Sequence, residues 1–292
     1  MAHPEIAPSA QQAHNPVPNA QARHGSVFVS HGSPMLIAGS SPAKAFLADL
    51  ARVFPDRPQA ILMASAHWLS ADPLVTGAAK PDTIHDFYGF PDALYQLRYP
   101  APGDPALAAQ LVQRLQASGY GGAQVDSERG LDHGAWVPLL LGFPDADIPV
   151  LQISLDPWAG PEGALALGAV FAGLWETDRI AVIGSGSLTH DLGRFREVRH
   201  HGEDVPEEAD VTAFADWIGE KIAQGDLAAL KDYRDLSPHG AAHHPTEEHF
   251  LPLFFAMGAG GFGPDAGGGD RLHVSSTHGV LSMDAYGFSP SA

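Results

Sequence analysis

The stretch VFVSHGSP, residues 27–34, decides the fold, because it leads an apolar strand directly to a histidine. Residues 27–29 are typical of a buried strand, Ser30 ends it, and His31 is followed at once by a Gly-Ser-Pro turn. The parallel strands of an open α/β sheet end at one edge, where the residues just beyond them line a common crevice. We therefore expect His31 to lie at that crevice.

Two later stretches repeat this pattern. The apolar run at residues 61–66 ends directly before His67, and the run at 180–184 leads through a short Ser- and Gly-containing segment to His190. A single histidine at a strand end is usually a hydrogen-bonded structural residue. Three histidines at the same place relative to one sheet predict a shared metal or catalytic site.

The order of the expected elements predicts an α/β fold. We expect a single domain with a central, mostly parallel or mixed sheet flanked by helices, and a metal site at the C-terminal ends of the strands. Ser41 is a good N-cap for a helix to about Val53, and this strand–helix–strand order predicts that the first two strands are parallel neighbours. Further elements are expected as a strand at 148–155, an amphipathic helix at 207–224, and edge strands at 273–277 and 280–283.

The chain of 292 residues is long enough for one large domain or two small ones, and no internal repeat or charged linker argues for two. Residues 1–24 are rich in Ala, Pro, Gln and Asn and have neither a basic start nor an apolar core of signal-peptide length. They predict a disordered N-terminal tail, which leaves residues 25–292 as the catalytic domain.

Composition narrows the classes of partner and of metal site. The absence of cysteine excludes disulfides, thiolate-bound zinc and iron–sulfur clusters, and leaves a metal to histidine and carboxylate. A net charge of −18 disfavours nucleic acid as a partner. No apolar run reaches about 18 residues, so we expect no membrane span and a cytoplasmic location. We also expect a monomer or small homo-oligomer.

Three further stretches carry candidate site residues. His133 lies in an expected turn, Asp132-His133-Gly134, where Asp132 is close enough in sequence to orient the imidazole, although a purely structural role is the alternative. Residues 84–91 belong to a long aromatic loop that is either a pocket wall or an aromatic minicore. Thr246 is expected to cap a helix through Met257, which would place Glu248 and His249 in its first turn, as metal ligands or as partners of the helix dipole.

A site with two or three histidine ligands, at most one carboxylate and open positions suits two chemistries. One is oxygen activation at non-haem Fe(II), and the other is hydrolysis at Zn(II). A metal-stabilised binding protein without turnover is a third alternative. The residues alone leave these three alternatives open.

The motifs together resemble the DODA-type (4,5-DOPA dioxygenase-like) family of class III extradiol ring-cleavage dioxygenases, from about Val27 to Tyr286. Each motif is short, and the order and spacing of the set make the resemblance specific. The motifs are HGSPM at 31–35, SAHW at 65–68, TIHDF at 83–87, YPAPG at 99–103, DHG at 132–134, GSLTH at 186–190 and EH at 248–249 before LPL.

The resemblance implies a metal-dependent enzyme that opens the ring of a catechol-type substrate and incorporates both atoms of O2. Fe(II) is the implied active metal, and Zn(II) is the other metal that such a site binds. His31 and His67 would hold the metal with a third ligand from Glu248 or His249, of which we favour His249. The implied catalytic residues, His190 and His133, would flank the substrate, and in zinc-loaded members His190 can move onto the metal.

Overall fold

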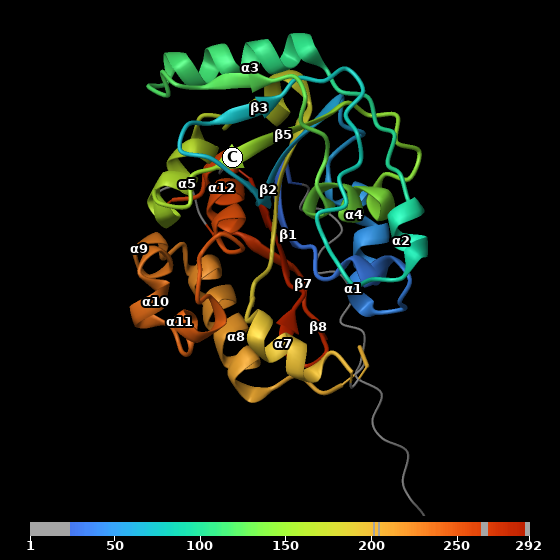
Figure 1. The fold of residues 1–292 in the computed structure, drawn as a ribbon. Helices are drawn as coiled ribbons and strands as arrows, with labels where there is room; N and C mark the ends of the chain where they lie inside the picture. The colour runs from blue at the N-terminus through green and yellow to red at the C-terminus, as the bar shows by residue number, and fades with distance from the viewer. Residues whose placement is uncertain (1–23, 201, 204, 264–267, 290–292) are drawn as a thin grey trace, which may run out of the picture.

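The computed structural model describes residues 24–200, 202–203, 205–263 and 268–289, which form an α/β fold around one mixed sheet of eight strands (Figure 1). The strand order is β4-β3-β5-β2-β6-β1-β10-β7. Their bounds are β1 Ser26–Ser30, β2 Ala60–Leu69, β3 Leu74–Thr76, β4 Gln124–Asp126, β5 Val150–Leu155, β6 Ile180–Gly186, β7 Asp270–His273 and β10 Ala285–Phe288. A separate small sheet pairs β8, Ser276–Thr277, with β9, Leu281–Ser282.

The four central strands, β5, β2, β6 and β1, run parallel to one another. Their apolar residues are buried on both faces, as expected of parallel strands that helices cover on both sides. The expectation that β1 and β2 are neighbours is wrong, because β6 lies between them and pairs with both. This order places the three strands that precede the candidate histidines side by side at the centre of the sheet.

Helices pack on the two faces of the sheet (Figure 1). One face is covered mainly by α3 (Pro105–Ala117), α5 (Gly160–Ala169), α8 (Ala209–Gln224) and α12 (Leu251–Ala259). The other is covered by α1 (Pro42–Ala48) and α4 (His133–Gly142), with the short helices η1 (Pro34–Ile37) and η2 (Leu50–Val53). The remaining helices are α2 Asp92–Gln96, α6 Leu174–Asp178, α7 Leu192–Val198, α9 Leu227–Lys231, α10 Tyr233–Leu236 and α11 Gly240–His243.

The expected N-cap of the first helix is confirmed. Ser41 Oγ accepts a hydrogen bond from the Lys44 amide, and Pro42 occupies the first turn. The α-helix ends earlier than expected, at Ala48, and a 3₁₀ turn continues it to Val53. The amphipathic helix expected at 207–224 is also present, as α8.

Several elements differ from the expectations. The long aromatic loop, expected over residues 73–105, contains β3 and α2, and His133 starts the unexpected helix α4 instead of lying in a turn. The late strands only partly match, because β10 pairs with β1 and leaves β7 at the edge, whereas β8 and β9 leave this sheet altogether.

Residues 1–23 of the expected tail lie outside the described residues, and His24, its last residue, is buried. Its Nδ1 lies 3.0 Å from Ser289 Oγ, so the folded part of the chain already includes residue 24. Within the described ranges, no helix has both the length and the apolar character that crossing a membrane requires.

Candidate metal centre

Three histidines from distant parts of the chain meet at the carboxyl edge of the central strands. His31 follows β1, His67 lies near the end of β2, and His249 lies in the turn before α12. One ring nitrogen from each lies within 4.8 Å of the other two, and the Nε2 atoms of His31 and His67 are 3.2 Å apart. The pairing of β2 with β5 shifts register between Ala64 and Leu69, an irregularity that commonly redirects side chains at functional sites.

Ser185, on β6, determines how the His31 ring is oriented. The Ser185 hydroxyl donates its proton to the Gly134 carbonyl oxygen at 2.5 Å, so its oxygen accepts from His31 Nδ1 at 2.9 Å. With the proton on Nδ1, the neutral ring of His31 has its lone pair on Nε2, the atom that faces His67. The Ser185 hydroxyl was not among the expected site residues.

The turn that carries His249 is held against the end of β6. The Ser187 amide donates to the His249 carbonyl oxygen at 2.9 Å, and a Cβ at Gly186 would lie only 2.2 Å from that oxygen. On the other side of the ring, His249 Nδ1 lies 3.3 Å from Glu248 Oε1. His190 stacks on His249, with ring centroids 3.4 Å apart and planes inclined by 11°.

The prediction that a helix starts directly after Thr246 is wrong. Thr246 Oγ1 donates to Glu248 Oε1 at 3.0 Å, so this side chain is engaged with its neighbour instead of a backbone amide. The helix α12 begins at Leu251, and Glu248 and His249 lie in the turn before it. The carboxylate of Glu248 groups with His190 and His249, whereas His249 alone joins His31 and His67.

His133 lies beside the three histidines and is oriented by Asp86. Asp86 Oδ1 is 2.9 Å from both the backbone nitrogen and Nδ1 of His133, and Asp86 Oδ2 is 3.6 Å from His67 Nδ1. The ring centroids of His67 and His133 are 4.0 Å apart. The expectation that Asp132 orients His133 is wrong, because its carboxylate accepts from Ser65 at 2.7 Å and Gln152 at 2.8 Å and caps α4.

The aromatic loop combines both roles that its sequence suggested. Phe87 is buried among Phe90, Tyr95 and Trp136, which makes an aromatic minicore. The same ring meets His133 edge-on at 5.7 Å, so this loop also walls the histidine cluster. Asp86 stands directly before Phe87 and was present in the stretch marked as a pocket wall, but its role required the fold.

Burial controls the protonation of the cluster. It lowers the pKa of His67 and of His190 to about 4, and it lowers the pKa values of His31 and His249 well below their usual range. Burial alone would raise the pKa of Asp86, but the hydrogen bond and charge of His133 lower it to about 2. Near neutral pH, neutral imidazole nitrogens therefore face one another beside an ionised carboxylate.

These residues fit a bound transition metal. Metal–nitrogen bonds of about 2.0–2.1 Å with angles between octahedral and tetrahedral values separate two ligand nitrogens by roughly 2.9–3.4 Å. The Nε2 atoms of His31 and His67 are 3.2 Å apart, within that range. Neutral imidazoles without thiolates suit iron or zinc, and the lowered pKa values keep the ligand nitrogens free of protons.

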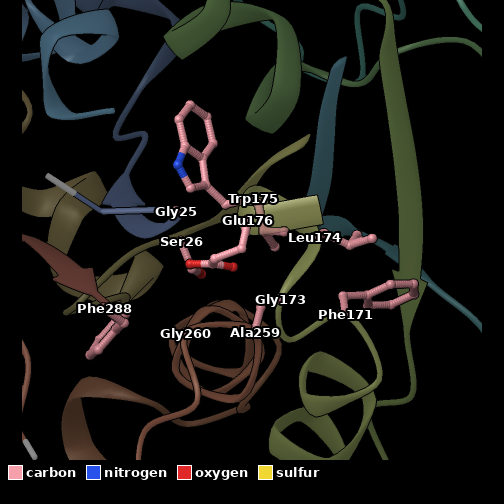
Figure 2. A pocket seen from close by; sticks show the side chains of 11 residues that line it. Gly25, Ser26, Phe171, Gly173, Leu174, Trp175, Glu176, Ala259, Gly260 and Phe288 are labelled. Carbon is pink, nitrogen blue, oxygen red and sulfur yellow. The ribbon is translucent and has the colours of Figure 1, made fainter. Parts of the chain in front are cut away.

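A cavity elsewhere in the molecule does not compete with this site. It lies at the other end of the central strands, where Ser26 begins β1, and is bordered by Trp175, Glu176 and Phe288 (Figure 2). Its volume is about 10 Å³, which is room for a single water molecule. An aromatic substrate does not fit there.

Comparisons with known proteins identify the family of the chain. Residues 25–281 match the family model of the catalytic LigB subunit of aromatic ring-opening dioxygenase. The chain is 38% identical over 268 residues to the 4,5-DOPA dioxygenase extradiol of Beta vulgaris, covering 89% of this chain and 95% of that protein. It is also 38% identical over 241 residues to the protein of the same name from Escherichia coli K12, covering 81% of this chain and 85% of that one.

The fold agrees as well. The crystal structure of an uncharacterized protein from Escherichia coli K12 superposes with a TM-score of 0.71 at 31% identity, covering 90% of this chain and 98% of the other. The matched segment of the family model contains all five candidate histidines. The chain therefore belongs to the LigB family of aromatic ring-opening dioxygenases.

Proposed function

We propose that the protein is an Fe(II)-dependent extradiol dioxygenase that opens the ring of a monocyclic catechol with O2. Its family is one of metal-dependent ring-opening dioxygenases, and the metal, the substrate class and the residue roles are our proposal. The observation that carries it is the set of three histidine nitrogens within 4.8 Å, with two more histidines beside them.

In this proposal His31, His67 and His249 hold the metal. Fe(II) bound there would supply the redox chemistry through which O2 reacts with a catechol. Three neutral imidazoles leave open coordination positions for both reactants, a condition that oxygen-activating iron sites share. Glu248 then orients the His249 ring through its Nδ1 and does not bind the metal, because its carboxylate groups with His190 and His249 and not with His31 and His67.

His133 and His190 are proposed to move protons. The Nδ1 of His133 is engaged by Asp86, so Nε2 is the ring nitrogen that takes a proton from a catechol hydroxyl. His190 stacks on His249, and its lowered pKa leaves it unprotonated at rest. In this proposal it first accepts a proton from the bound catechol and then passes that proton to oxygen during ring opening. His133 lies beside His67 and His190 beside His249, so the two proposed proton-transfer groups contact different ligands.

The same ligand set would also suit Zn(II), and the zinc hydrolase considered from the sequence would use it. Family membership favours oxygen chemistry over that alternative and over a binding protein without turnover. The zinc-loaded protein therefore serves as a control, and Zn(II) binding alone is not evidence for a hydrolase.

The test is oxygen uptake by protein loaded anaerobically with Fe(II) and offered a panel of 4-substituted catechols. We expect one O2 consumed per catechol and a yellow ring-opened semialdehyde, with no turnover in the zinc-loaded control. Absence of uptake with every catechol would refute the proposal. Turnover by the zinc-loaded protein that persists after removal of O2 would instead support the zinc hydrolase.

A further inference from the structure

We infer that Asp86 is a positioning residue for two histidines at once. Its carboxylate keeps the Nδ1–H form of both His133 and His67, and so couples metal binding to proton transfer. The inference rests on the proposed function and deepens it. Asp86 groups closely with His67 and His133, yet it is neither one of the three proposed ligands nor one of the two proposed proton-transfer histidines.

The contact with His133 fixes one tautomer. Asp86 Oδ1 is 2.9 Å from the backbone nitrogen of His133 and 2.9 Å from its Nδ1. An ionised carboxylate only accepts hydrogen bonds, so both nitrogens donate to it. With the proton held on Nδ1, the base form of the ring has its lone pair on Nε2, as a base requires.

The contact with His67 acts through charge. Asp86 Oδ2 lies 3.6 Å from His67 Nδ1, which is too long for a hydrogen bond. The side chains of Asp86 and His67 are largely shielded from water, with exposed fractions of 26% and 21%. Solvent therefore screens the attraction between the carboxylate and the ring N–H only weakly. The negative charge favours the ring proton on Nδ1, the nearer nitrogen, over Nε2.

This preference determines what His67 presents to His31. In the Nε2–H form, His67 would donate to His31 Nε2 across their 3.2 Å separation, and a proton would occupy the position of the metal. In the Nδ1–H form, two lone pairs face each other at that distance and repel unless a cation binds both. Asp86 therefore favours the form of the cluster that needs a metal.

The carboxylate is presented by an anchored segment. On one side of Asp86, the Ile84 amide donates to the Leu131 carbonyl oxygen at 2.8 Å, and the Ile84 carbonyl oxygen accepts from Trp136 Nε1 at 2.8 Å. On the other side, Phe87 is buried in the aromatic minicore. These contacts anchor the backbone on both sides of Asp86.

The test compares Asp86→Ala and Asp86→Asn with the wild type. The control, Asp270→Asn, removes a carboxylate from another His–Asp pair, in which Asp270 Oδ2 lies 3.3 Å from His24 Nε2 at the opposite edge of the sheet. Three quantities are measured: Zn(II) affinity by competition with a chelator, histidine tautomers by ¹⁵N NMR of histidine-labelled protein, and kcat with Fe(II) as a function of pH.

We expect Asp86→Ala to weaken Zn(II) binding about 10–100-fold, the usual effect of losing a residue that orients a ligand. Its His133 signals should lose the pure Nδ1–H pattern. In Asp86→Asn, the amide oxygen still accepts the two hydrogen bonds from His133, while its NH2 group faces His67. That variant should keep the His133 tautomer yet lose Zn(II) affinity, and the Asp270→Asn control should match the wild type in all three measurements.

Wild-type Zn(II) affinity together with unchanged histidine tautomers in both Asp86 variants would overturn the inference. If Asp86→Ala does not fold, Asp86→Asn still tests the effect on His67, because its hydrogen bonds to His133 remain. A wild-type protein that opens no catechol would refute the proposed function and leave the Zn(II) and NMR results to judge Asp86 separately.

Discussion

Gly186 offers a strict test of whether His249 belongs to the metal centre. Its backbone does not adopt the left-handed conformation, so Gly186→Ala acts through steric contact alone. The new Cβ would lie 2.2 Å from the His249 carbonyl oxygen and 3.1 Å from both the His249 carbonyl carbon and Pro252 Cγ. Since real Cβ atoms do not come within 3.0 Å of such atoms, the turn must retreat by roughly 0.8 Å.

That retreat is large on the scale of a metal–ligand bond, which tolerates about 0.2 Å. It also stretches the hydrogen bond from the Ser187 amide to the His249 carbonyl oxygen, now 2.9 Å. We expect Gly186→Ala to weaken Zn(II) binding by at least about 100-fold, the upper end for residues that merely orient a ligand. Overpacking at this buried position should also lower the free energy of unfolding by about 1–3 kcal/mol.

The assay is chelator competition for Zn(II), with urea unfolding of the metal-free protein measured in parallel. Gly121→Ala is the matched control, because a Cβ there meets no atom within 4 Å and should change neither quantity. A folded Gly186→Ala protein with wild-type Zn(II) affinity would show that the position of the turn does not determine ligation. The reasoning that makes His249 a ligand would then fail.

Three further predictions concern the same centre. Glu248→Ala should weaken Zn(II) binding about 10–100-fold and His249→Ala far more, and the reverse order in chelator competition would make Glu248 the ligand. His133→Phe and His190→Phe should keep Fe(II) affinity while lowering kcat by about 10²–10⁴-fold in oxygen-uptake assays, and loss of metal from the second would make His190 a ligand. Folded His67 and His190 titrate at about 4 against 6.5 when unfolded, so the unfolded chain binds more protons between these values. Acidification from pH 6.5 to 4 should therefore lower the unfolding free energy of the metal-free protein by up to about 1.4 kcal/mol per pH unit per histidine, and urea curves that coincide at pH 7 and pH 5 would contradict this.

Local sequence patterns predicted the features that depend on a few consecutive residues. The apolar runs before His31 and His67 predicted two strands that end at one edge of the sheet, and the fold brings the Nε2 atoms of these histidines to 3.2 Å. Ser41 predicted its helix because an N-cap needs only its own side chain and the next three residues. Thr246 has the same residue preference, and the prediction there was wrong because its hydroxyl is engaged by Glu248.

Features that depend on distant residues could not be predicted in this way. Asp86 and His133 are 47 positions apart, and only the packing of the aromatic loop on α4 brings them together. The helix α4 itself contains Gly134 and Pro138, which disfavour helices, yet it is buried on nearly all sides. Tertiary packing there outweighs local preference.

The insertion of β6 between β1 and β2 has a consequence for how the chain is made. The ribosome completes β1 and β2 long before β6, so these two strands have no partner between them until residues 180–186 emerge. At about 5–20 residues per second, roughly 10–40 s separate the synthesis of His31 from that of His249. A nascent chain must therefore keep two apolar strand edges from aggregating during this interval, and it acquires its third candidate metal ligand, His249, well after the first two.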